Sequence, residues 1–250
     1  MYFNRGILSK TFKDALIPFV GFTSIGLLFL IVYLVQTTQQ PHLPVTGPGS
    51  LIQTVSSMYY SMFGVIISFM YCILVASKII AGDVEDGSWA VLLVSQHSRN
   101  KIMFNKIIGF VLTILVQYLV FFVIGAIIIA SSNLGYKPIG KFALVNLSMF
   151  ALTVLFASIC VIIATLFERR IYPMLITGAI FIAFYLFKFL TKMFNQLEVM
   201  EYFTIISLFV PKWIDNGNAN IAITITMSLV VGTGLFIGSI FIFNRKNLSI

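Results

Sequence analysis

Charged side chains are scarce in this 250-residue chain, where aspartate, glutamate, lysine and arginine together make up only 10% of the residues. A soluble domain of ordinary composition carries about 25% of these residues, because its surface faces water. Hydrophobic residues account for 59% of the chain, and the mean hydropathy is +1.02. Most of the outer surface must therefore face surroundings as apolar as the core. This excludes a water-soluble globular protein and predicts a membrane protein.

Residue types that support catalysis or metal binding are also few, with two histidines, two cysteines and eight acidic residues. His42 and His97 fall on opposite sides of the membrane in the topology described below, so they cannot share a metal ion. Cys72 and Cys160 lie inside apolar runs, which is typical of small buried hydrophobic residues. Neither an HExxH zinc motif nor a GxSxG nucleophile motif occurs. We therefore predict no catalytic residue, no metal site and no cofactor held by this chain.

Three further features suggest functions that we reject. The net charge of +8 could indicate nucleic-acid binding, but the basic residues lie between apolar runs, where anionic lipid would attract them. The segment Gly135–Lys141 matches the start of a phosphate-binding loop, yet Phe142 stands where a hydroxyl should bind magnesium. Asp83, Glu85 and Asp86 cluster in one loop and could suggest catalysis, but we interpret them as a solvated charge run.

Six apolar runs are long enough to cross about 30 Å of hydrocarbon, which takes roughly 20 helical residues. Backbone polar groups find no water inside lipid, so each run is expected to form a helix. These properties predict an all-α membrane protein with a single transmembrane domain over residues 1–250. The runs are Leu16–Val35, Val55–Ser77, Ile107–Ala130, Phe142–Phe167, Ile171–Leu190 and Ile221–Phe243.

Shorter helices are expected beside these runs. Between Phe3 and Leu16, apolar residues recur at helical spacing, which predicts an amphipathic elbow helix on the membrane surface. A disordered basic leader is the alternative. The run Phe203–Val210 is too short to span, so we expect short outer helices before the sixth span, with Trp213 as an interfacial anchor. A GxxxG pattern in the sixth run, Gly234 to Gly238, favours close helix packing.

The distribution of basic residues predicts the orientation. If the N-terminus is cytoplasmic, eleven of the 16 lysines and arginines, including every arginine, lie on the cytoplasmic side. Six crossings then place both termini in the cytoplasm of a multi-pass cell-membrane protein. The central turns of all six runs lack ionisable Asp, Glu, Lys, Arg and His residues. Ion-coupled transporters usually carry such residues at membrane depth, so any transport here would need another energy source.

The longest cytoplasmic loop, residues 78–106, joins the second and third runs. Its middle, Ser88–Val94, predicts a short amphipathic helix with Ser88 as a candidate N-cap and acidic residues at its positive end. Ser98 is a candidate cap for the next helix. Such an element suits docking into a groove on a cytosolic protein. A plain surface helix resting on lipid headgroups is the alternative.

The loop contains the pattern Glu85-x-Gly87-Ser88-x3-Leu92-Leu93-x-Ser95-x2-Ser98-Arg99-x2-Ile102-x3-Lys106. This pattern resembles the coupling loop of type-2 ATP-binding-cassette permeases. The order of elbow, six spans, short fourth-to-fifth turn and outer helices is also similar to that family. One departure is that Gln96 and His97 stand where the family usually has a proline.

The resemblance implies a permease subunit of an ATP-driven exporter. Such a permease pairs with a second permease, identical or related, and binds a cytosolic ATPase subunit that holds ATP and Mg²⁺. The implied substrate is hydrophobic or amphipathic: a peptide, a lipid or a drug. Within the family, the sequence looks most like small Gram-positive permeases for amphipathic peptides, such as the staphylococcal phenol-soluble modulin exporter. A lipid-modifying membrane enzyme and a passive channel or scaffold remain alternatives.

Overall fold

The computed structural model describes residues 5–39, 44, 50–89, 98–132, 136–193, 204–210, 214 and 220–245. Within these ranges the chain is helical and contains no strand. Six helices are long and apolar enough to cross a membrane, which confirms the predicted all-α membrane class. Five of them are α1 (Arg5–Thr38), α6 (Arg99–Ser131), α7 (Ile139–Leu166), α8 (Ile171–Met193) and α10 (Asn220–Arg245).

The second membrane helix is continuous from Leu51 to Glu85 but changes its winding along its length. Wider π-helical turns interrupt an α-helix twice, and such turns frequently occur at functional sites. The second of them directly precedes the loop identified in the sequence. The segments are α2 (Leu51–Val55), η1 (Ser56–Gly64), α3 (Val65–Ala76), η2 (Ser77–Gly82) and α4 (Asp83–Glu85).

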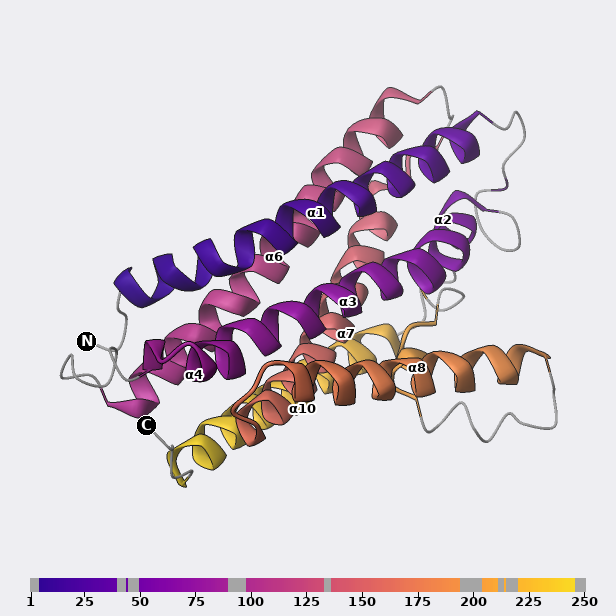
Figure 1. Ribbon diagram of the computed structural model, residues 1–250. Helices are drawn as coiled ribbons and strands as arrows, with labels where there is room; N and C mark the ends of the chain where they lie inside the picture. Colours follow the sequence, from indigo (N-terminus) through magenta and orange to yellow (C-terminus); the bar gives the residue numbers. More distant parts are fainter. Residues whose placement is uncertain are drawn as a thin grey trace.

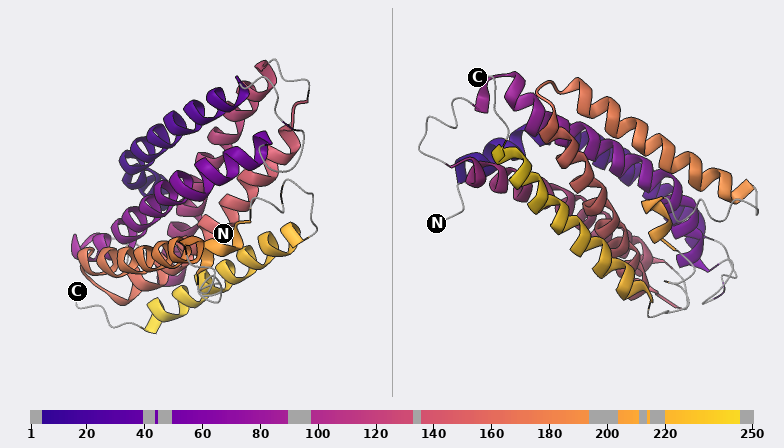
Figure 2. Two further views of the ribbon diagram at one scale, coloured as in Figure 1. Left: turned by 90° about the vertical axis from the view of Figure 1, so that its right-hand side faces the viewer. Right: turned by 90° about the horizontal axis from the view of Figure 1, so that it is seen from below.

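The second membrane helix and α7 form the centre of the bundle (Figures 1 and 2). In each of them 72% of the apolar window is buried, whereas the value is 22% for α1 and 11% for α8. Phe69 of α3 and Phe156 of α7 stack with ring centroids 3.9 Å apart. Helix α10 packs on α7, and α1 packs on α6. The outer helices therefore present most of their apolar surface to lipid or to another chain.

Several polar side chains inside the bundle are paired across helices. Tyr60 donates to Asn146 Oδ1 at 2.8 Å, and Tyr71 donates to Thr113 Oγ1 at 2.6 Å. Gln117 differs, because neither amide atom of this fully buried side chain has a hydrogen-bond partner in the described part of the chain. Hydrogen bonds between helices stabilise packing in lipid, where apolar burial discriminates poorly.

The N-terminal segment departs from the expected elbow. Helix α1 runs without a break for 34 residues, about 50 Å at 1.5 Å per residue, with Pro18 inside it. Its first turns pack on α6, where a Cβ on Gly109 would lie 3.0 Å from Thr11 Cγ2 and 3.5 Å from Leu8 Cδ2. The apolar face assigned to the membrane surface thus contacts a neighbouring helix. Phe3 lies outside the described residues.

The described residues before the sixth span include one of the expected short helices, the 3-10 segment η4 (Ile205–Leu208). Thr204 caps it by accepting from the Ile206 backbone nitrogen at 3.0 Å. Lys188 of α8 donates to the Ile206 carbonyl at 3.2 Å. Trp213, the predicted anchor, lies outside the described residues.

The close helix contact of the sixth span does not involve the predicted glycine pair. A Cβ on Gly234 or Gly238 would meet nothing within 4 Å. Gly232 instead provides the close approach, because a Cβ there would lie 3.4 Å from Leu155 Cα of α7. The predicted glycine pair faces away from the described helices, and its neighbour two residues earlier packs against the centre of the bundle.

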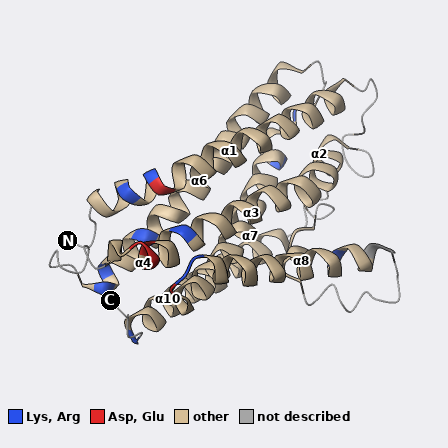
Figure 3. Cartoon of the chain, in the orientation of Figure 1, with Lys and Arg blue, Asp and Glu red and all other residues tan. Residues whose placement is uncertain are grey.

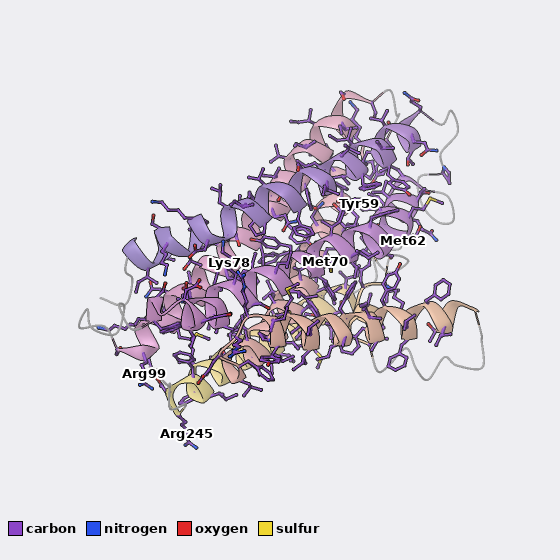
Figure 4. All side chains as sticks on the ribbon, in the orientation of Figure 1. Tyr59, Met62, Met70, Lys78, Arg99 and Arg245 are labelled. Atoms are coloured by element: carbon purple, nitrogen blue, oxygen red, sulfur yellow. The ribbon has the colours of Figure 1, made fainter. Side chains whose placement is uncertain are left out.

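Most charged side chains of the described chain gather at one end of the bundle, where α1 begins and α10 ends (Figure 3). Figure 4 shows Arg99 and Arg245 at this end. An even number of crossings accounts for both described ends of the chain lying together. We call this region the charged end and define it by Lys10, Asp83, Glu85, Arg99, Lys106, Arg170 and Arg245.

Candidate functional site

The candidate site is the base of the loop that follows the second membrane helix at the charged end. Helix α4 ends at Glu85, and Gly87 then adopts a positive φ of 69°. Its backbone nitrogen donates to the Val84 carbonyl at 3.1 Å. Left-handed glycine is the usual residue just past a helix end, since it lacks a Cβ that would clash. Gly87 therefore fixes where the helix stops and the loop begins.

Asp83 lies buried between two lysines from different helices. Lys10 of α1 approaches Asp83 Oδ1 at 3.2 Å, and Lys106 of α6 binds Asp83 Oδ2. Lys106 is 1% exposed and also donates to the Ile79 carbonyl of η2 at 2.7 Å. One carboxylate thus joins three membrane helices. The interpretation of Asp83 as part of a solvated charge run is wrong, because its partners come from remote segments of the chain.

Trp89 anchors the first described residues of the loop to the bundle. Its Nε1 donates to the Ile80 carbonyl at 3.2 Å, and its ring is 1% exposed. Lys106 Nζ lies 4.1 Å from the centre of this ring, in a cation–π arrangement. On another side, Phe243 of α10 stands with its ring centroid 4.5 Å away. The tryptophan therefore connects the loop to both α6 and α10.

Glu85 connects the loop to the turn between α7 and α8. Its Oε2 accepts from the Arg170 backbone nitrogen at 2.9 Å, immediately before α8 begins at Ile171. A carboxylate at the start of a helix is favoured, because unpaired N–H groups and the helix dipole make that end positive. Glu85 is exposed, so this contact lies at the rim of the site.

The other predicted coupling residues divide into described and undescribed ones. Ser88 is helical and half-buried, and Arg99 is the first residue of α6. Ser98 has the extended backbone of an N-cap, but its side chain makes no capping hydrogen bond. Leu92, Leu93 and Ser95 lie outside the described residues, as does most of the predicted helix Ser88–Val94. The structure therefore brings Glu85, Gly87, Ser88 and Lys106 together at the loop base.

Three residues of this site were not among the sequence candidates: Lys10, Asp83 and Trp89. A tryptophan directly after a Gly-Ser pair in a chain with only two tryptophans is a signal that could have drawn attention to Trp89. No local signal distinguishes Asp83 from its exposed neighbours. The two lysines that bind it are separated from it by 73 and 23 residues.

The arrangement suits mechanical linkage between helices. Its groups are ion-paired, stacked or hydrogen-bonded to backbone, and no cluster of metal-ligating side chains occurs among the described residues. The rejected phosphate-loop match places Gly140 and Lys141 in the first turn of α7, at the opposite end of the bundle, and Gly135 lies outside the described residues. A displacement of the loop would act on α1, α6, α8 and α10 together.

A comparison with protein families identifies one family for this chain. A family model described as "ABC-2 family transporter protein" matches residues 6–248, almost the whole chain. A search of curated proteins finds no match.

Proposed function

Because the chain belongs to the ABC-2 transporter family, we propose that it is the membrane permease subunit of an ATP-driven exporter. The energy would come from a cytosolic ATPase subunit that binds ATP and Mg²⁺, since the phosphate-loop match in this sequence has Phe142 where a hydroxyl should bind magnesium. The observation that carries the proposal is the loop base. Buried contacts of Asp83, Trp89 and Lys106 tie it to three membrane helices besides its own.

The orientation of the chain in the membrane is inferred from the charged end of the bundle. We place the charged end in the cytoplasm, where the positive-inside rule puts short arginine- and lysine-rich segments. Both termini are then cytoplasmic, and the loop between Glu85 and Arg99 faces the ATPase. The predicted helix Ser88–Val94 would enter a cleft of that subunit with Leu92 and Leu93 as apolar contacts.

Closure of the ATPase would move the membrane helices through the contacts described above. A force on the loop passes through Trp89 to α10, through the Asp83–Lys106 pair to α6, and through Glu85 to the start of α8. The π-helical segment η2 precedes these contacts and is the part of the second membrane helix best suited to change its winding.

The substrate class is inferred from an exposed stripe on the otherwise buried second membrane helix. Met58, Met62 and Met70 are 54%, 49% and 40% exposed, so all three side chains point away from the packed core of the bundle. Figure 4 labels Met62 and Met70 along this helix. Methionine adapts to apolar partners of varied shape. We propose that this stripe contacts a hydrophobic or amphipathic substrate, with an amphipathic peptide as the leading candidate, in a complex of two permeases.

The test uses the full chain co-expressed with a candidate cytosolic ABC ATPase subunit from the same organism. The double variant Leu92→Asp/Leu93→Asp should reduce the ATPase retained on the tagged permease by about tenfold or more, as expected for buried apolar anchors of an interface. The matched control, Tyr136→Asp, changes an exposed apolar residue between α6 and α7 and should leave retention unchanged. Equal retention in both variants would refute docking through this loop.

A further inference from the structure

A cavity of about 400 Å³ opens near the charged end, between α1, the second membrane helix and α8. Its walls come from three places where the chain passes between membrane and water in the sequence. Pro18 follows the start of the first apolar run, Ser77 and Lys78 stand at the end of the second, and Arg170 precedes the fifth. The cavity therefore lies at the level of the lipid headgroups.

Two cations line this cavity, and no carboxylate is among its described lining residues. Lys78 donates to the Asp14 carbonyl at 2.8 Å, which uses one of its three N–H donors and leaves its charge uncompensated by that bond. Arg170 is exposed, and its stem lies along η2, since a Cβ on Gly82 would lie 3.9 Å from Arg170 Cβ and Cδ. The two positive groups thus reach one cavity from different elements.

Two acidic residues near this cavity, Asp83 and Glu85, are engaged elsewhere, and Asp14 and Glu168 are not among its described lining residues. Asp83 binds Lys10 and Lys106. Glu85 accepts from the backbone nitrogen of Arg170. A site with two cations and no carboxylate in its described lining favours an anionic ligand.

The remaining wall is apolar and continues into the lipid-facing surface. Leu74 and Met174 lie one helical turn deeper than Lys78 and Arg170, and both line the cavity. Ile171, also in the lining, is 49% exposed. A ligand that fits both parts has a negative headgroup and a hydrocarbon tail. A free inorganic anion would use only the upper, polar part.

We propose that this cavity binds an anionic phospholipid, with Lys78 and Arg170 holding the phosphodiester and the acyl chains resting on Leu74 and Met174. Bound lipid bridges the π-helical segment η2 to the start of α8. These are elements that the loop also contacts, so the lipid occupies a position from which it influences their separation. The site is independent of the ATPase partner, and its test needs this chain alone.

The first experiment titrates the purified full chain in neutral detergent with three probes: dihexanoyl phosphatidylglycerol, dihexanoyl phosphatidylcholine and inorganic phosphate. Binding is followed by isothermal calorimetry and by the rise in unfolding temperature, because a ligand that binds only the folded state stabilises it. Phosphatidylglycerol should bind about tenfold more tightly than phosphatidylcholine. Equal binding of the two lipids, or phosphate binding as tight as phosphatidylglycerol, overturns the proposal without requiring any variant to fold.

The second experiment compares Lys78→Gln and Arg170→Gln with Arg169→Gln. Arg169 is exposed and adjacent to Arg170 but does not line the cavity, so its variant removes the same charge from the same turn. Each cavity variant should weaken phosphatidylglycerol binding about fivefold, the usual contribution of one basic residue near anionic lipid. If Arg169→Gln weakens binding as much, attraction is a property of the whole charged end and the site is refuted.

Discussion

Lys106 Nζ binds the Asp83 carboxylate at the loop base, and the same ammonium group donates to the Ile79 carbonyl at 2.7 Å. Both residues are buried, and the Trp89 ring covers the ammonium at 4.1 Å from its centre. A buried ion pair loses most of its solvation, so the pair as a whole contributes little net stability. The loss of one partner alone is costly, since it leaves an uncompensated charge away from water.

Removal of the lysine should therefore destabilise the fold strongly. In Lys106→Met, Asp83 keeps only the partly exposed Lys10, and the Ile79 carbonyl loses its side-chain donor. We expect a loss of about 3–5 kcal/mol in the free energy of unfolding. The measurement is the unfolding temperature of the detergent-solubilised chain, followed by loss of the monodisperse chromatographic peak.

Two further variants test whether the loss of stability comes from the unpaired buried charge of Asp83 or from any replacement of a lysine. Lys13→Met removes an exposed lysine of α1 and should leave the unfolding temperature within error. The double variant Asp83→Leu/Lys106→Met removes both buried charges and should recover much of the loss. Similar stability of the single and double variants would show that the ion pair is not the source of the effect.

Glu85 should affect coupling more than stability, because it is exposed and holds the Arg170 backbone nitrogen at the start of α8. We expect Glu85→Ala to leave the ATPase bound but to lower substrate-stimulated ATP hydrolysis about tenfold, the size of effect typical for loss of one transmitting contact. The amide oxygen of Glu85→Gln can still accept a hydrogen bond. Its rate of ATP hydrolysis should therefore lie between those of Glu85→Ala and the native chain.

Asp86→Ala provides the comparison for this experiment, since Asp86 is the neighbouring exposed carboxylate at the same helix end. Hydrolysis by this variant should match the native chain within a factor of about two. Equal loss in Asp86→Ala and Glu85→Ala would assign the effect to the negative charge of the loop and would remove the contact with Arg170 from the mechanism.

The membrane helices were predictable because hydrophobic length is a local property of the sequence. Six apolar runs, with no ionisable Asp, Glu, Lys, Arg or His residue in their central turns, give six helices without knowledge of how they pack. The elbow was not predictable in the same way. A stripe such as Leu8 and Thr11 serves equally well against lipid or against Gly109 of α6, and the sequence does not distinguish these partners.

At the loop base, too, features that depend on neighbouring residues were predictable, and features that depend on contacts between distant segments were not. Gly87 at a helix end follows from local rules, and the structure confirms that it takes a positive φ. Asp83 looks like its exposed neighbours Glu85 and Asp86 until Lys10 and Lys106 are brought to it by packing. Burial of a charge depends on contacts between distant segments, which periodicity and composition do not encode.

Two buried amides of the bundle differ in their hydrogen bonding and should respond oppositely to substitution. Asn146 accepts from Tyr60 at 2.8 Å and donates to the Phe142 carbonyl at 2.9 Å. Gln117 has no partner for either amide atom in the described part of the chain. Gln117→Leu should therefore raise stability by about 1–3 kcal/mol, whereas Asn146→Leu should lower it by a similar amount.

The comparison is internal, because each variant replaces a buried amide with an apolar side chain of similar size. Unfolding temperatures measured side by side in one detergent give the sign of each change. If Gln117→Leu lowers the unfolding temperature, the amide makes a stabilising interaction that the described residues do not include, and the view of Gln117 as an unpaired polar group is wrong.

The glycines of α10 allow a test of helix packing with a control two residues away. A Cβ on Gly232 would lie 3.4 Å from Leu155 Cα, in ordinary contact, so Gly232→Ala is tolerated but a longer side chain has backbone in its way. Gly234 has nothing within 4 Å. We expect Gly232→Leu to destabilise the α7–α10 contact by about 1–3 kcal/mol through overpacking, and Gly234→Leu to leave stability unchanged or slightly higher.

Gly234→Leu also tests the association of two permeases, because this residue faces away from the described helices. Suppose that Gly234→Leu has the same unfolding temperature as the native chain but no longer forms a complex of two permeases. The open glycine face of α10 is then where the second permease packs.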